Sequence, residues 1–321
     1  MTGAWARWVR LWSGREPPWS LAAVRILLGA VILYDLTEIA RLGLIDALFA
    51  GQPLGLSDAA ARTDPPLFTS WFGASPRAGH ALYAAMAVST AFLTAGLFTR
   101  ASAVVLLFAW AQFAQILPAA DRGIDTLCRD VLVVFVFADA GAAWSMDAWA
   151  KTGSWRGSGA PIPAWPRRLL VLQLVAMYFL AGVQKVGVHW WPPGHFAALY
   201  FILQDPAIAR IDFGWLRDPP WFQLTQLGSA GTLLFQDTYP MVLLLRYAKS
   251  TASRGGWRAR LAAWGWTEWV WIGTGAVFHL MLAATCELGI FPAAMLALYP
   301  AWLGPAEWAW LGQREGNTPA T

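Results

Sequence analysis

The sequence contains few charged residues. Only 13% of its 321 residues are Asp, Glu, Lys or Arg, whereas 57% are hydrophobic. A soluble domain carries roughly 25% charged residues because its surface must be wetted. This shortage excludes an ordinary soluble globular protein, and the mean hydropathy of +0.45 agrees with that exclusion. We therefore predict an all-α integral membrane protein whose main surroundings are membrane lipid.

Cysteine, histidine and catalytic sequence motifs are also scarce. The two cysteines, Cys128 and Cys286, are too few for a disulfide framework, and we interpret them as two buried thiols. A single bridge is the alternative if both lie at outer helix ends. The four histidines are scattered, and the spacing of His189 and His195 does not suit a metal site, so no metal is predicted. The sequence has no GxSxG, HExxH or Walker motif.

Long apolar runs, by contrast, are abundant. Windows of about 17–25 mainly apolar residues predict eight membrane-spanning helices in a polytopic bundle. They cover residues 20–41, 78–98, 101–118, 127–144, 168–188, 223–246, 266–287 and 288–304. Seven spans is the alternative, because the last two are separated by little more than Gly289 and Pro292.

The distribution of positive charge predicts the orientation. If the N-terminus is inside, the inner segments hold twice as many Lys and Arg residues as the outer ones, which favours both termini inside. The excess charge of +4 lies in short loops rather than in a stripe, so we predict no nucleic-acid partner. We divide the chain into a basic interfacial segment (1–19), a transmembrane domain (20–304) and a polar tail (305–321). The long outer connections 42–77 and 189–222 are expected to cap the outer face.

A lysine stands near the outer end of the fifth predicted span, in YFLAGVQKVGVHWW (178–191). At 1.5 Å per residue, Lys185 lies about 25 Å beyond Arg168, near the outer edge of a hydrocarbon core about 30 Å thick. One interpretation is a lysine that snorkels above a tryptophan belt. The other is a general base, because an apolar site disfavours the charged ammonium. Gln184, His189 and Trp190 accompany it.

Polar residues in other predicted spans fall at a similar outer depth. They are Asp35, Glu38, Gln112, Asp125, Arg129 and His279. Ionisable groups within a membrane usually face the interior of the bundle, so these residues predict a polar cavity open to the outer face. The alternative is a set of ion pairs that hold helices together, such as Asp35 with Arg129. Arg25, at the inner end of the first span, is placed to snorkel.

Five short motifs occur in a characteristic order between Arg25 and Leu303. They are VRILLGAVILYD (24–35), AGLFTRAS (95–102), FADAGAAWSMD (137–147), YFLAGVQK (178–185) followed by Trp190, and VFH (277–279). Together they resemble the membrane domain of vitamin K-dependent gamma-carboxylases, which is shared with bacterial HTTM (horizontally transferred transmembrane) proteins. The resemblance implies a location in the bacterial plasma (inner) membrane.

The resemblance also implies a chemistry. In that family a lysine deprotonates a reduced naphthoquinone of the vitamin K or menaquinone type, so Lys185 takes the role of base and His279 that of its partner. A small secreted peptide or protein would be the substrate of such a lyase. The animal carboxylases have Lys-Lys where this chain has Gln184-Lys185. They also have a histidine near the position of Gly123–Asp125 and a large extramembrane domain. We expect the quinone chemistry to tolerate these differences better than the carboxylation of glutamate.

Other functions remain open from the sequence. They are the maturation or export of a secreted toxin peptide, a transporter and a non-catalytic scaffold. The sequence does not fix the oligomeric state.

Overall fold

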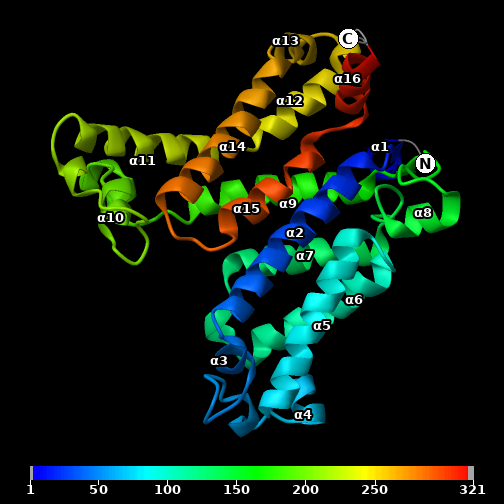
Figure 1. Cartoon of the computed structure of the whole chain (residues 1–321). Coiled ribbons are helices and arrows are strands. Elements are labelled where there is room, and N and C mark those ends of the chain that lie inside the picture. The colour runs from blue at the N-terminus through cyan, green and yellow to red at the C-terminus, as the bar shows by residue number, and fades with distance from the viewer. Residues whose placement is uncertain (1–2, 317–321) are drawn as a thin grey trace, which may run out of the picture. The chain divides into compact units, whose positions relative to one another are not determined.

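The computed structural model describes residues 3–316 and is built almost entirely of helices (Figure 1). The chain divides into two compact units. The first unit comprises the residues up to Leu170 together with the segment from Ala297 onward, and the second comprises Val171–Leu296. Helix α9 (Trp165–Val183) begins in the first unit and ends in the second. The predicted helical fold is confirmed.

The first unit contains most of the N-terminal half of the chain. Its other helices are α1 (Ala4–Trp12), α2 (Trp19–Arg41), α3 (Ile45–Phe49), α4 (Leu67–Phe72), α5 (Pro76–Ala95), α6 (Thr99–Ile116), α7 (Gly123–Phe137), α8 (Met146–Thr152) and α16 (Pro305–Gly316). The two-residue strands β1 (Arg15–Glu16) and β2 (Ile162–Pro163) pair antiparallel. Helix α2 packs on α5, α5 on α6, and α6 on α7.

Small residues and a tight turn explain this packing. A Cβ on Gly29 of α2 would lie 2.2 Å from the Thr94 hydroxyl of α5, so only glycine allows the two helices to approach this closely. Helix α5 ends at Gly96, whose φ of 69° is left-handed. Asp147 then caps α6 by accepting hydrogen bonds of 2.8 Å from the backbone amides of Phe98 and Thr99.

Arg25 does not snorkel, contrary to the prediction. Its side chain is 0% exposed and donates a hydrogen bond of 2.5 Å to the carbonyl of Trp144. The guanidinium also occupies the space beside Gly96, where a Cβ would lie 1.7 Å from Nη1. Because Gly96 leaves that space open and Trp144 supplies an acceptor, the arginine binds the adjacent loop inside the protein instead of extending to water.

The second unit is made of shorter helices besides its part of α9. They are α10 (Ala198–Gln204), α11 (Trp221–Asp237), α12 (Met241–Ser250), α13 (Trp257–Ala263), α14 (Glu268–Thr285) and α15 (Phe291–Ala297). Cys286 belongs to a small core with Leu203, Phe213 and Leu216. Elsewhere in the unit, Glu268 is 1% exposed and is paired with Lys249 at 2.8 Å. Cys128 and Cys286 are both buried and free, as predicted.

Three helices in the described part of the chain are long and apolar enough to cross a membrane: α2, α5 and α9. The run predicted as a span over 223–246 is two helices, because Pro240 has no amide hydrogen with which to continue α11. The run over 288–304 contains α15 of only seven residues and a 3₁₀ turn that includes Pro300. The number of spans stays a prediction.

Polarity is distributed as in a membrane protein. Large apolar side chains such as Leu27 and Tyr34 of α2 and Phe108 of α6 are 41–63% exposed. Polar groups lie inside instead, with Gln112 at 4% and Asp125 at 1% exposure. A soluble protein would bury the apolar side chains and expose the polar ones, so the exposed apolar side chains here fit contact with lipid.

Candidate functional site

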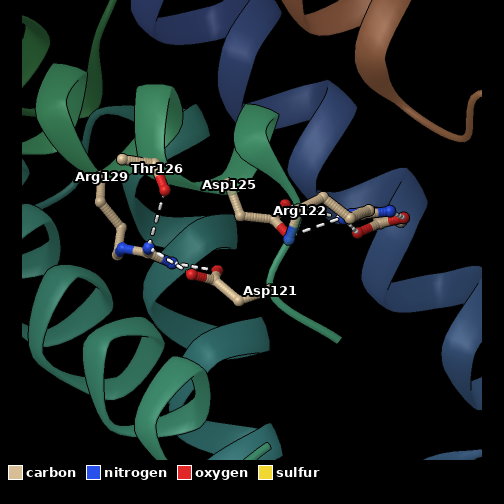
Figure 2. Close-up of polar contacts among 6 residues, drawn as sticks. Asp121, Arg122, Asp125, Thr126 and Arg129 are labelled. Atoms are coloured by element: carbon tan, nitrogen blue, oxygen red, sulfur yellow. Dashed lines mark hydrogen bonds and ion pairs between the residues drawn. The ribbon is translucent and has the colours of Figure 1, made fainter. Parts of the chain in front are cut away.

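An ionic cluster built on the buried carboxylate of Asp125 connects α2 with the start of α7 in the first unit (Figure 2). The Arg122 guanidinium donates to Asp35 Oδ2 at 2.6 Å and to Asp125 Oδ1 at 2.8 Å. The Asp125 side chain is only 2% exposed, so this carboxylate depends on the arginine for neutralisation. The cluster joins α2 and α7 through the N-cap residue of α7.

The local sequence explains how Asp125 reaches Arg122. Arg122 is the N-cap residue of α7 and Asp125 is its third residue, so the carboxylate turns back to accept the Arg122 backbone amide at 2.9 Å. Burial lowers the pKa of the Arg122 guanidinium, but the hydrogen bonds to Asp125 and Asp35 outweigh burial, and the pKa lies above its ordinary value. Arg122 is therefore a permanent cation.

Arg129 belongs to a second pair beside the first. Its guanidinium donates to the Asp121 carboxylate at 2.6 and 2.8 Å and to the Thr126 hydroxyl at 3.1 Å (Figure 2). The predicted pairing of Asp35 with Arg129 is wrong, because Arg122 takes Asp35 and the preceding loop presents Asp121 to Arg129. Ion pairs do connect helices here, but with different partners.

A cavity of about 140 Å³ lies beside the Arg122 cluster. Asp35, Arg122 and Asp125 line its polar side, and apolar residues including Phe49, Trp110 and Phe113 line the rest. Two other predicted site residues have local roles. Glu38 pairs with Arg41 on its own helix at 2.6 Å. Gln112 accepts the Phe68 amide at 2.8 Å and so attaches α4 to α6.

Lys185 lies in the second unit, just beyond the end of α9, and its side-chain amino group donates hydrogen bonds to uncharged groups. Its Nζ donates to the Ala181 carbonyl and to Gln236 Oε1, each at 2.8 Å, and lies 5.1 Å from the centroid of the Trp190 ring. Within the described residues, no carboxylate pairs with Lys185 within 4.0 Å. The Trp191 indole donates to the Lys185 carbonyl at 2.8 Å and fixes the backbone there.

Sequence reasoning missed Gln236 and Asp237, which come from the end of α11. A Cβ on Gly182 would lie 2.2 Å from Asp237 Oδ1 and 3.0 Å from Gln236 Cβ. Gly182 therefore allows the end of α11 to lie close enough to α9 for Gln236 to reach Lys185. Asp237 Oδ1 is buried without a hydrogen-bond partner among the described residues. The glycine three residues before the lysine was the signal available in the sequence.

His279 on α14 is buried at 1% exposure among aromatic rings. Its ring centroid lies 5.7 Å from that of Tyr178 and 5.4 Å from that of Phe291. Neither ring nitrogen has a hydrogen-bond partner in the described part of the chain. Buried polar atoms of this kind usually bind something, so His279 can accept or donate a hydrogen bond to a ligand.

The remaining predicted residues are sequence neighbours of Lys185. Gln184 precedes it, and His189 and Trp190 follow it. Gln184 and His189 are exposed, and Trp190 is half-buried. The His189 ring packs against Phe201, with centroids 4.6 Å apart. Of the ten predicted site residues, five thus lie in the first unit and five in the second. The single cavity predicted for all of them stays a prediction.

A family model described as the HTTM domain matches residues 15–252, which include Lys185, Gln236 and the Arg122 cluster but end before His279. No solved structure matches the chain.

Proposed function

The chain belongs to the HTTM family, and from this premise we propose that it is a membrane enzyme of the vitamin K-dependent carboxylase type in which Lys185 is a general base. The hydrogen bonds of the lysine carry the proposal. A neutral amine has two N–H groups and one lone pair, and two neutral acceptors lie 2.8 Å from Nζ. The lone pair then remains available for a proton.

The location proposed for this chemistry is the outer side of a bacterial inner membrane. We propose eight spans with both termini inside, as the bias of Lys and Arg indicates. Lys185 follows α9, one of the three long apolar helices, at its outer end in this orientation. The amine would there meet substrates that approach from the membrane or from outside.

A reduced naphthoquinone fits the side chains that surround Lys185 and His279. The Trp190 ring offers an aromatic face 5.1 Å from the amine, and the two unpartnered nitrogens of His279 lie among aromatic rings. Flat aromatic ligands are typically held by such rings, with a few polar groups to orient them. Trp190 would hold the ring system, and His279 would orient it by a hydrogen bond.

When bound, such a quinol supplies an acidic hydroxyl and the electrons for reaction with oxygen. Lys185 Nζ accepts the hydroxyl proton and becomes an ammonium with three N–H donors. Gln236 and the Ala181 carbonyl accept two of these bonds throughout, so the amine keeps its position as its charge changes. The third N–H faces the site from which the proton came.

The experiment is quinol oxidation by the purified protein in nanodiscs. A reduced naphthoquinone is supplied with oxygen, and quinone and epoxide products are followed for wild type and for Lys185→Ala. General-base catalysis typically contributes about 10²–10⁴-fold. We expect Lys185→Ala to lose at least the lower of these factors, with its helical content unchanged.

A charge control is available in Arg254→Ala, which removes an exposed cation far along the sequence from this segment. It should oxidise quinol at the wild-type rate. Equal rates for wild type and Lys185→Ala would overturn the assignment of the base.

A further inference from the structure

The first unit contains a groove of about 750 Å³ that none of the proposed chemistry uses. Its cations come from three separate segments: Arg15 on β1, Arg100 on α6 and Lys151 on α8. Asp139 and Asp147 also line it. Three positive charges gathered from distant parts of the sequence in one groove indicate a site for an anion.

The two acidic residues of the groove are already engaged. Asp139 accepts from Arg100 at 2.6 Å. Asp147 accepts from the amides of Phe98 and Thr99 and from the Thr99 hydroxyl. Burial raises the pKa of Asp147, but these hydrogen bonds outweigh burial and hold it below its usual value. Asp147 therefore stays ionised at neutral pH, and both carboxylates already accept hydrogen bonds from the protein.

The cations keep donors free for a ligand. Arg15 donates Nε and Nη2 to the Pro161 carbonyl at 3.0 and 2.6 Å, which orients its guanidinium and leaves Nη1 available. Lys151 forms no ion pair within the described residues, and it is exposed. One fixed guanidinium and one exposed ammonium suit the several oxygens of a phosphate group.

The groove lies at the level where lipid headgroups are expected. Arg15 precedes the first long apolar helix, α2, by four residues, and Phe98 follows the end of the second, α5, by three. Phe98 lines the groove with 66% exposure, and Trp149 and Trp155 stack nearby with 51% and 54% exposure. Exposed aromatic residues at helix ends are typical of the membrane interface.

From this geometry we propose that the groove binds the phosphate of an anionic phospholipid on the inner leaflet. Arg15 and Lys151 contact the phosphate, and the aromatic residues contact the beginning of the acyl chains. The Lys and Arg bias places this end of the bundle inside, where anionic lipids attract cationic residues.

The test measures thermal stabilisation of the delipidated full-length protein in detergent. Short-chain phosphatidylglycerol is titrated beside phosphatidylcholine of the same chain length, and sodium phosphate and glycerol phosphate form a separate arm. We expect phosphatidylglycerol alone to stabilise the wild type, and Lys151→Gln to weaken its apparent affinity about tenfold.

Two matched variants make the result decisive. Lys151→Arg should restore the affinity, and Arg156→Gln, an equal charge change on an exposed residue outside the groove, should leave it unchanged. Stabilisation by phosphatidylcholine equal to that by phosphatidylglycerol would overturn the proposal. Stabilisation by glycerol phosphate equal to that by phosphatidylglycerol would overturn it too. The same holds if Arg156→Gln weakens the affinity for phosphatidylglycerol as much as Lys151→Gln does.

Discussion

The two units hold their central cations in opposite ways. Arg122 in the first unit is held by two carboxylates, Asp35 and Asp125. Lys185 in the second unit is held by an amide and a carbonyl oxygen. Carboxylates fix a positive charge permanently, whereas neutral acceptors tolerate both the charged and the neutral amine. From this comparison we propose that Arg122 serves the architecture and Lys185 the chemistry.

The largest structural effect is expected from removing the architectural cation. In Arg122→Ala, Asp125 would remain almost fully buried without its cation, and breaking such a pair typically costs about 3–5 kcal/mol. We expect the free energy of unfolding in micelles to fall by that amount. A matched control is Arg41→Ala, which breaks the exposed pair with Glu38 and should cause no measurable change.

A double variant sharpens this prediction. Arg122→Ala with Asp125→Asn should recover part of the lost stability, because the amide carries no charge to leave buried. Equal stabilities for Arg122→Ala and Arg41→Ala would show that the cluster does not hold the first unit together.

An intermediate effect is expected where α9 and α11 meet. In Gly182→Ala the new methyl group would overlap Asp237 Oδ1 and press on Gln236 Cβ. Such overpacking costs about 1–3 kcal/mol, and it should also slow quinol oxidation by displacing Gln236 from Lys185. The control is Gly231→Ala within α11, where nothing lies within 4 Å of the added Cβ. If both variants behave like wild type, close approach at Gly182 is not required.

The smallest effect concerns the cap of α6 and depends on pH. The folded pKa of Asp147 is lowered below its usual value of 3.8, so its ionised form stabilises the fold. This contribution is complete above the unfolded pKa, and it is lost as the pH falls through the lower folded pKa. Asp147→Asn should cost about 0.5–2 kcal/mol at pH 7 and less near pH 2. If Asp147→Asn lowers the free energy of unfolding by the same amount at both pH values, the ionised carboxylate does not have this role.

The positions of the helices could be predicted from the sequence better than the side-chain pairings between them. Apolar runs placed α2, α5, α6, α9 and α14 to within a few residues, because long uncharged segments have few alternatives to a helix. The break at Pro240 was also visible in the sequence, but the surrounding apolar residues concealed it. Proline removes a backbone donor whatever its neighbours are, so it should have decided the boundary.

Pairings between helices were the less predictable part. Asp35 was assigned to Arg129 by depth, yet it pairs with Arg122, because that residue is the N-cap of α7 and turns toward α2. Gln236 was not foreseen beside Lys185, since it lies 51 residues away and Gly182 indicates a close approach without naming the partner. Depth along a helix follows from counting residues, whereas the facing partner depends on tertiary packing.

The most direct test of Lys185 as a base is quinol oxidation by Lys185→Arg beside wild type. Arginine keeps a positive charge and several N–H donors, but it does not lose its proton in proteins. If Lys185 accepts a proton, Lys185→Arg should be as inactive as Lys185→Ala while still folding with the wild-type helical content. Substantial quinol oxidation by Lys185→Arg would contradict the base and would show that a fixed positive charge is sufficient.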